Sequence, residues 1–334
     1  MPLVRASAAP NLALSKYWGK RPGGAANLPV ADSLSVTLNA FRTTVELRAA
    51  RQDLILWAPA AGGPTTPLPD RLLPPYTRVL AAARRDWDLP PGLEATFLPT
   101  LEPAQGLAGS AAAFAAFAAA LTILGGRSLS HPEDLRRASI LARLGSGSAC
   151  RSLHGGFVRW QRGELSDGSD SFAIPLPPVL PDLALLVVLL APGRKATSST
   201  EGMLRSAATS RLFPWWIDRC NQDCDAIQAA LQANDFATLG HHAEANALAL
   251  HAVCLASTPP LLYATPDTLR VFQLAADLRA QGLPVYVTLD AGPNPVLLHL
   301  PPARARLHSE LGALFPQAPL LDLWPGDGAR HEPR

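Results

Sequence analysis

The sequence predicts a globular α/β protein, because segments with strand-like and helix-like patterns alternate along the whole chain. The 334 residues are 48% hydrophobic and 17% charged, so there is ample apolar material for a large core and disorder is not expected. This length suits two domains or one large α/β unit. An apolar strand should end near Ala191, where a more helical half begins. We therefore predict domains at residues 1–190 and 191–334.

The first half contains one clear strand pattern and two clear helix patterns. Val36–Leu47 is rich in β-branched residues and predicts a strand. Residues 59–75 hold several prolines among polar residues, and we expect a surface excursion without catalytic residues. Gly109–Leu124 is rich in alanine, has bulky residues at helical spacing and precedes a glycine pair, which predicts a buried helix. Ser130–Glu133 has the pattern of a capping box with proline in the first turn, which predicts a helix through Leu144.

Three further strands are expected later in the chain. Each is apolar or rich in β-branched residues, and turn-forming residues bound it. They are Gly156–Gln161, Leu183–Leu190 and Val285–Leu289. No internal repeat or coiled-coil heptad is evident, so the architecture should come from these alternating strands and helices.

Composition argues against several classes of protein. A formal net charge of +2 gives no broad electrostatic surface for nucleic acid, so an anion would have to be bound by a local cluster. The first residues lack the long apolar run of a signal peptide, and the apolar residues 184–191 are too few to span a bilayer. We therefore expect a soluble cytoplasmic protein that binds neither nucleic acid nor a membrane.

The four cysteines are few and scattered, which argues against a disulfide scaffold in a chain of this size. We expect them to be reduced. Cys220 and Cys224 could be combined with His241 and His242 in a zinc site, but their four-residue separation suits one face of a helix better.

The segment Asn11–Lys20 is the first candidate anion site. It places two lysines, a tyrosine and a tryptophan beside a short apolar run. Lys16 and Lys20 cannot both turn into a core, so at least one should project where the chain leaves its strand, within reach of a phosphate or carboxylate. The alternative is an ordinary strand end whose lysine tips are solvated.

A glycine-rich turn before the alanine-rich helix is the second candidate. Its residues are Gly106, Leu107, Ala108, Gly109 and Ser110. Glycines let the backbone approach a phosphate, the helix N-terminus supplies free N–H groups, and the Ser110 hydroxyl could contact phosphate or a metal ion. No lysine follows Gly109, so this is not a Walker A loop. The alternative is a glycine turn that serves only helix packing.

Two more motifs carry polar groups in patterns typical of active sites. Ser146 and Ser148 could donate to anionic oxygens while Arg151 forks a carboxylate, although a capped helix start with a solvated arginine would look the same. Asp290 follows an apolar strand and precedes a glycine turn, where α/β active-site residues often lie. An aspartate there could equally form a turn. The hydroxyl-rich residues 195–203 are interpreted as a helix cap.

Together these motifs resemble one family, the diphosphomevalonate decarboxylases of the GHMP kinase superfamily. The resemblance extends through most of the chain and depends on six ordered matches. These are Ala9–Asn11 with Lys16–Lys20, Asn27–Pro29 with Asp32–Thr37, Gly106–Ser110, Gly145–Arg151 with Gly155 and Gly156, Ser198–Met203, and Asp290–Asn294.

The resemblance implies a two-domain GHMP-kinase fold, of mixed α/β (α+β) class. An N-terminal domain like ribosomal protein S5 and a ferredoxin-like C-terminal domain would hold substrate and ATP in the cleft between them. The implied reaction is the ATP-dependent decarboxylation of 5-diphosphomevalonate to isopentenyl diphosphate in the mevalonate pathway, assisted by Mg²⁺. The resemblance also implies a homodimer.

The same resemblance assigns roles to individual residues. Asp290 would orient or deprotonate the 3-hydroxyl, Lys16 would favour the ionised form of that carboxylate, and Arg151 would hold the carboxylate that leaves. The residues expected to hold the substrate, mainly its diphosphate, are Asn11, Tyr17, Lys20, Ser146, Ser148 and Ser199. The turn Gly106–Ser110 would bind the ATP phosphates, and Ser110 would also serve the metal ion.

The sequence departs from the family's pattern at two positions. Gly109 replaces the first serine of a pair, which leaves Ser110 and the backbone amides for ATP. Thr200 stands where some bacterial members carry an arginine for the diphosphate, and Arg71 or Arg78 could supply that charge instead. A site one arginine short could prefer the monophosphate, so phosphomevalonate decarboxylase is an alternative. A GHMP small-molecule kinase such as mevalonate 3-kinase and a non-catalytic relative are the others.

Overall fold

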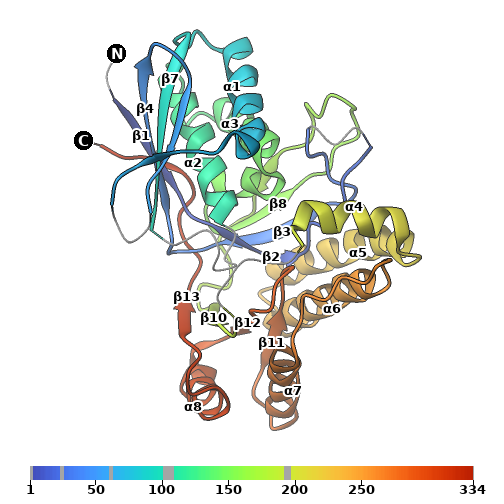
Figure 1. Ribbon diagram of the computed structural model, residues 1–334. Coiled ribbons are helices and arrows are strands. Elements are labelled where there is room, and N and C mark those ends of the chain that lie inside the picture. The colour runs from blue at the N-terminus through green and yellow to red at the C-terminus, as the bar shows by residue number, and fades with distance from the viewer. Residues whose placement is uncertain (1–2, 23–25, 60–62, 101–108, 192–196, 334) are drawn as a thin grey trace.

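The first sheet contains six strands and lies beside the chain's two ends (Figure 1). The computed structural model describes residues 3–22, 26–59, 63–100, 109–191 and 197–333. Within them, the strand order of this sheet is β14 (Arg330–His331), β1 (Val4–Ala8), β4 (Thr43–Ala50), β7 (Gly92–Pro99), β5 (Leu54–Trp57) and β6 (Thr66–Pro67). Buried and more exposed residues alternate along β7, which is the pattern of a sheet with one face on a core.

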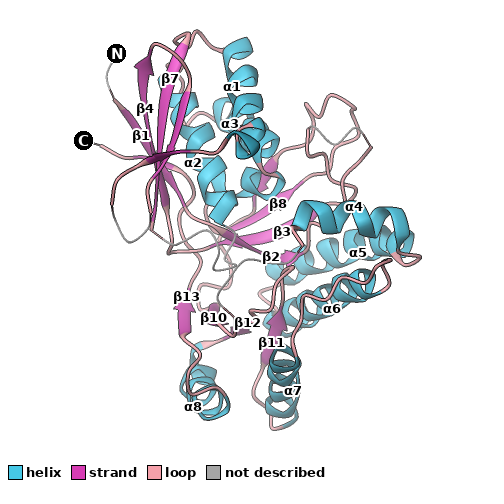
Figure 2. Cartoon of the chain, in the orientation of Figure 1, coloured by secondary structure: helices cyan, strands magenta, loops and turns pink. Residues whose placement is uncertain are grey.

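Three helices cover the inner face of this sheet: α1 (Pro74–Asp86), α2 (Gly109–Leu124) and α3 (Pro132–Gly145). Helix α2 is buried from Ala111 to Thr122, because its many alanines let it contact β1, β4 and the other helices closely. It occupies the residues that the alanine-rich pattern predicted. Figure 2 shows it lying between the sheet and the rest of the molecule.

Two four-stranded antiparallel sheets form the remainder of the β structure. The second sheet has the order β2 (Asn11–Ser15), β3 (Ser33–Thr37), β8 (Phe157–Trp160) and β9 (Ala173–Pro175). The third has the order β11 (Val285–Thr288), β12 (Val296–His299), β10 (Ala184–Val188) and β13 (Leu320–Leu323). The strands β8, β10 and β11 lie within the segments predicted for them.

Helices α5 (Phe213–Gln232) and α6 (Phe236–Leu255) join these two sheets. Leu14 and Leu34 of the second sheet share one buried core with Leu185 of the third sheet, Ile227 of α5 and Leu239 of α6. Helix α4 (Ser199–Thr209) lies near α5 and α6, whereas α7 (Pro266–Ala280) and α8 (Arg304–Leu314) cover the far face of the third sheet (Figure 1). Short 3₁₀ helices are η1 (Asp70–Leu72), η3 (Gly147–Leu153) and η4 (Pro301–Ala303).

The prediction of one strand over Val36–Leu47 was wrong. Strand β3 ends at Thr37 and β4 begins at Thr43, and the two belong to different sheets. Phe41 between them has a φ of +63°, a left-handed conformation that interrupts an extended chain. The chain therefore turns from one sheet into the next inside a segment that is rich in β-branched residues at both of its ends.

The predicted capping box was also wrong, although the helix that it introduced is confirmed. His131 occupies the N-cap position of α3 without a side-chain capping bond. The Ser130 hydroxyl instead lies 2.7 Å from that of Ser128, and Asp134 accepts a hydrogen bond from the Ser128 backbone. Local hydroxyl partners in the preceding turn therefore replace the reciprocal capping bonds.

The remaining predictions of local structure are confirmed in part. All four cysteines are free and buried, and Cys220 and Cys224 lie on the same helix, α5. Among residues 63–75 the chain forms β6, η1 and the start of α1, and Leu68 and Leu72 line the large cavity described below. The described part of the proline-rich segment lies at the surface, as predicted, and some of its residues also line the cavity.

The division into domains at residue 190 stays a prediction. Strand β10 precedes that position but pairs with β12 and β13, and β14 returns from the end of the chain to β1. Among the residues that the structure describes, no helix has the length and apolar character needed to cross a bilayer.

Candidate active site

A cavity of about 1150 Å³ lies where the first sheet and its helices face α4 and the end of β11. Most of the residues predicted to carry function line it. They are Lys16, Tyr17, Lys20, Gly109, Ser110, Ser146, Ser148, Arg151, Ser199 and Asp290. Gly106, Leu107 and Ala108 fall outside the described residues. Asn11 does not appear in the lining and reaches the site only through its neighbours.

Lys16 and Asp290 form an ion pair at the wall of the cavity. The Lys16 Nζ lies 2.8 Å from Asp290 Oδ1 and also donates to the Ala13 carbonyl at 2.7 Å. The Lys16 side chain is 2% exposed, whereas that of Asp290 is 37% exposed. Burial lowers the pKa of Lys16, and the Asp290 carboxylate opposes this effect. The pair therefore presents an accessible carboxylate to the cavity, supported from behind by a buried amine.

Arg151 is held in a fixed orientation by Asn11 and Ser33. Its Nε and Nη2 donate to Asn11 Oδ1 at 3.1 and 3.0 Å, and its Nη1 donates to the Ser33 hydroxyl at 2.5 Å. Asn11 in turn donates to the Ser148 carbonyl and the Ser152 hydroxyl. Burial lowers the pKa of Arg151, but a guanidinium stays charged at neutral pH. These contacts use three of the five guanidinium N–H groups, and the other two N–H groups take no part in them.

Tyr17 is fixed by packing rather than by a hydrogen bond. Its ring lies 4.7 Å from that of Trp160, between centroids. A Cβ at Gly147 would lie 2.6 Å from the Tyr17 ring, so only glycine allows this close approach. The Tyr17 hydroxyl is buried without a hydrogen-bond partner among the described residues, and burial raises its pKa. An unpaired buried hydroxyl at the edge of a cavity is suited to binding a polar ligand.

Lys20 lies at the opposite end of the same segment. Its Nζ donates to Asn27 Oδ1 at 2.8 Å and lies 3.3 Å from the Thr200 hydroxyl. Burial lowers the pKa of Lys20, and the positive charge of Arg78 lowers it further. The charge of Arg78 therefore acts on Lys20, although Arg78 itself does not line the cavity, and Arg71 is exposed on η1.

Hydroxyl groups gather at the N-terminus of α2. The hydroxyls of Ser110 and Ser146 lie 3.4 Å apart, so the two predicted loops meet. Ser199 begins α4 across the cavity, and the preceding Ser198 accepts a hydrogen bond from the Glu201 backbone as its N-cap. The predicted cap in this hydroxyl-rich segment is confirmed. Ser110 and the α2 terminus together form a surface suited to anionic oxygens.

Two sets of residues around the site were missed by sequence reasoning. His251 of α6 lies against the backbone of Leu289 and Asp290, and burial lowers its pKa to about 4. The second set surrounds Asp32, which pairs with Arg159 at 2.6 and 2.9 Å and accepts a hydrogen bond from the Arg162 backbone. No spacing in the sequence could have indicated these contacts, because the partners are far apart along the chain.

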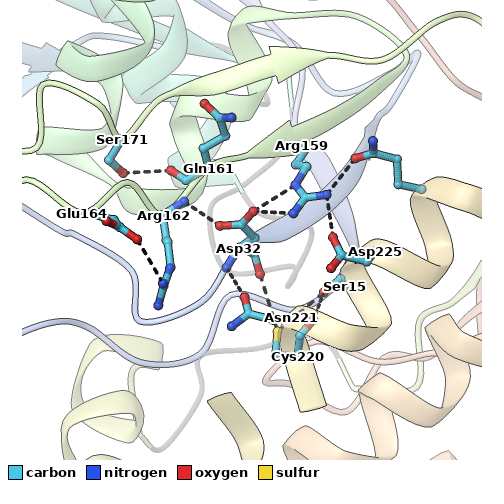
Figure 3. Close-up of polar contacts among 11 residues, drawn as sticks. Ser15, Asp32, Arg159, Gln161, Arg162, Glu164, Ser171, Cys220, Asn221 and Asp225 are labelled. Atoms are coloured by element: carbon cyan, nitrogen blue, oxygen red, sulfur yellow. Dashed lines mark hydrogen bonds and ion pairs between the residues drawn. The ribbon is translucent and has the colours of Figure 1, made fainter. Parts of the chain in front are cut away.

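Figure 3 shows how the Asp32 cluster joins β3 and β8 to helix α5. Arg159 also pairs with Asp225 of α5 at 2.8 Å and donates to Gln228 at 2.9 Å. The Asp32 backbone N–H donates to Asn221 Oδ1 at 3.0 Å. Ser33, which follows Asp32, is the residue that holds Arg151. The cluster therefore fixes a wall of the cavity to the helix behind it.

The chain matches sequence profiles over most of its length. The Mevalonate 5-diphosphate decarboxylase C-terminal domain matches residues 185–324. The Diphosphomevalonate decarboxylase-like N-terminal domain matches residues 8–68 and 74–173. The diphosphomevalonate decarboxylase of Candida albicans is 34% identical over 301 residues, which cover 86% of this chain and 82% of that protein.

Solved structures agree with these matches. The mevalonate diphosphate decarboxylase from Staphylococcus aureus aligns with a TM-score of 0.88 and 32% identity over 99% of this chain and 98% of the other. A structure described as MDDEF in complex with MVAPP, AMPPCP and magnesium aligns with a TM-score of 0.86 and 32% identity over the whole of both chains.

The Asp32 cluster predicts a measurable contribution to stability. Asp32→Asn removes the charge that Arg159 and the Arg162 backbone share, so we expect the free energy of unfolding in urea to fall by about 2 kcal/mol. Glu164→Gln is the matched control, because the Glu164 side chain is 86% exposed and lies 3.7 Å from Arg162. That variant should change stability by less than about 0.5 kcal/mol. Equal stability of the two variants would contradict the role given to the cluster.

Proposed function

This chain belongs to the diphosphomevalonate decarboxylase family, and we infer from the site that it is an ATP-dependent decarboxylase of 5-diphosphomevalonate. The products are isopentenyl diphosphate, ADP, phosphate and CO2. The observation that carries this inference is the meeting of the Lys16–Asp290 pair, Arg151 and the Ser110 helix terminus in one cavity. This reaction requires a carboxylate to accept the hydroxyl proton, a cation to bind the substrate's carboxylate and an anion site to bind the phosphates.

The reaction proceeds in two chemical parts. The oxygen of the substrate's 3-hydroxyl attacks the γ-phosphorus of ATP, ADP leaves, and the hydroxyl proton passes to a base. The bond between C3 and that oxygen then breaks, and phosphate departs with the bonding electrons. The bond to the carboxylate breaks as CO2 leaves, and its electron pair forms the new double bond.

We propose that Asp290 is the residue that orients and deprotonates the 3-hydroxyl. Its carboxylate is the accessible member of the Lys16 pair, and the adjacent buried ammonium stabilises its charged form. Lys16 itself is too enclosed to be the main contact of a bulky substrate. Lys16 instead holds Asp290 in position and stabilises its ionised form.

Arg151 is proposed to bind the carboxylate that leaves as CO2. Its contacts with Asn11 and Ser33 set the plane of the guanidinium, and two N–H groups remain for a substrate. Asn11 thus contributes by orienting Arg151. A fixed orientation matters because the departing carboxylate must align with the C3–oxygen bond for both bonds to break together.

The diphosphate is proposed to bind near Lys20. The other groups assigned to it are Tyr17, Ser146, Ser148 and Ser199, all of which line the cavity. Of the two arginines considered from the sequence, Arg78 is the one proposed to assist, because its charge acts on Lys20. Arg71 is not assigned a role.

ATP and Mg²⁺ are proposed to bind beside the α2 terminus. Free backbone N–H groups there and the Ser110 hydroxyl suit the phosphates, and the same hydroxyl suits a magnesium ion held mainly by phosphate oxygens and water. Among described residues no group of three or more acidic, histidine or cysteine side chains could hold a metal by itself. When bound, Mg²⁺ would neutralise charge on the transferring phosphate. The homodimer and the cytoplasmic location stay predictions.

One observation favours a second candidate substrate. Thr200, an uncharged residue, lies beside Lys20 where an arginine would add a second charge. A weaker phosphate site would suit 5-phosphomevalonate, giving isopentenyl phosphate instead. Arg78 supports the diphosphate because it restores a second cation near Lys20. The kinase alternative is disfavoured, since it would give Arg151 no departing carboxylate to act on.

The direct test of function measures CO2 and ADP release with ATP and Mg²⁺. The purified protein is offered 5-diphosphomevalonate, 5-phosphomevalonate and mevalonate in separate reactions. We expect equal amounts of CO2 and ADP, with the highest kcat/KM for the diphosphate. A higher value for the monophosphate would support the second candidate. Release of ADP without CO2 would identify a kinase and overturn the proposed function.

Replacing Asp290 should remove most of the activity. Asp290→Asn keeps the size of the side chain but loses the proton acceptor, so kcat should fall about 10²- to 10⁴-fold. Binding of the substrate, measured by calorimetry, should weaken much less. If turnover in this variant stays within about tenfold of the original, Asp290 is not the residue that activates the hydroxyl.

The two arginines can be separated by parallel substitutions. Arg78→Ala should raise the KM for 5-diphosphomevalonate about tenfold or more, because it removes a positive charge that acts on Lys20 at the proposed phosphate site. The KM for ATP should change little. Arg71→Ala is the matched control and should leave both constants unaltered. The assignment is wrong if the two variants behave alike.

A further inference from the structure

Lys16 is the first residue beyond β2, and its backbone is held by the two helices behind the site. Its backbone N–H donates to Asn246 Oδ1 of α6 at 2.8 Å, and its carbonyl accepts from the Cys220 thiol of α5 at 3.1 Å. Asn246 is completely buried. The residue that supports Asp290 is thus anchored at both backbone groups by side chains from α5 and α6.

Asp223 of α5 determines which way the Asn246 amide points. The Asp223 carboxylate accepts a hydrogen bond from Asn246 Nδ2 at 3.0 Å, and it is 1% exposed. Because an ionised carboxylate can only accept, the amide nitrogen of Asn246 must face it. The amide oxygen is then left facing the Lys16 N–H. Each partner alone favours this orientation of the amide, and the two together fix it.

Asp223 is itself fixed from the outer side. Its carboxylate accepts from Arg219 Nε at 2.8 Å and lies 3.0 Å from His242 Nδ1. Helix α5 is anchored independently to the second sheet by Asn221 and Asp225, the contacts drawn in Figure 3. The chain of contacts from Arg219 to Lys16 therefore begins on a helix with a fixed position.

We propose that Asn246, oriented by Asp223, is a positioning residue for the reaction. It holds the Lys16 backbone so that the buried ammonium meets Asp290, and it touches neither substrate nor ATP. This inference rests on the proposed function, because it assigns to Lys16 and Asp290 the roles given above. It adds two buried residues of α5 and α6 to the groups on which turnover depends.

The ion pair between Lys16 Nζ and Asp290 forms only while the Lys16 backbone stays in place. Lys16 Nζ is held by only the Ala13 carbonyl and Asp290 among the contacts described, so its position depends on where its backbone lies. Removing Asn246 leaves a buried backbone N–H without a partner, and the chain must shift to find one. A displacement of about 1 Å at a catalytic group can lower a rate by roughly a hundredfold.

The test compares Asn246→Ala with the original protein and with Gln228→Ala. Gln228 lies on α5 and contacts Arg159 but not Lys16, and Arg159 keeps Asp32 and Asp225 in its absence, so the control should keep its turnover. Asn246→Ala should lower the kcat of CO2 release about tenfold or more and leave the KM for ATP within about twofold. Thermal unfolding confirms that each variant is folded. Asp223→Asn, a smaller change, should give the same pattern with a weaker loss.

A double-mutant cycle with Asp290→Asn distinguishes positioning from general damage. If Asn246 acts through Lys16 and Asp290, adding Asn246→Ala to Asp290→Asn should lower kcat by less than about twofold. Independent, multiplying losses would overturn the proposal, as would an unchanged kcat in folded Asn246→Ala. An original protein that releases no CO2 from any of the three substrates would overturn the proposed function, and this inference with it.

Discussion

The arrangement of the site depends on placing the Lys16 ammonium in a buried position beside Asp290. An isolated charge there would cost several kcal/mol, so the fold must supply compensating partners. The Ala13 carbonyl and the Asp290 carboxylate are those partners, and they come from the middle of β2 and from just beyond β11. The second and third sheets, which come from different parts of the chain, must therefore be held in a fixed position relative to each other. The α5–α6 pair does this, since both helices contact β2 and α6 also contacts β11.

The packing of the rest of the molecule holds the Lys16–Asp290 pair in place. Leu14 and Leu34 share a core with α5, α6 and the third sheet, so the second and third sheets cannot separate without exposing apolar surface. The Asp32–Arg159 contacts fix α5 to β3 and β8. On the opposite wall, the buried helix α2 is packed against the first sheet and directs its N-terminus at the cavity. The walls are thus built by separate hydrophobic clusters.

Local patterns in the sequence were sufficient for some of the elements, and most of the residues predicted to carry function do line the cavity. The alanine-rich pattern gave α2 its correct bounds, and lysine, serine and aspartate motifs far apart in sequence do meet in one cavity. Phe41 was missed because its left-handed backbone reflects the crossing between two sheets rather than any local preference. The anchoring of Lys16 by Asn246, 230 residues away, leaves no trace in local spacing. Such contacts are determined by tertiary packing, which a single sequence does not display.

We propose that Asp290, supported by Lys16, delivers the substrate's 3-hydroxyl to the γ-phosphoryl group of ATP. The most direct measurement follows the oxygen atom of that hydroxyl. The protein is given 5-diphosphomevalonate labelled with oxygen-18 at the 3-hydroxyl, and the released phosphate and water are examined by mass spectrometry. The label should appear in inorganic phosphate, because the oxygen leaves C3 as part of the transferred phosphoryl group. Label in water, with unlabelled phosphate, would mean that ATP is hydrolysed separately and would contradict the account.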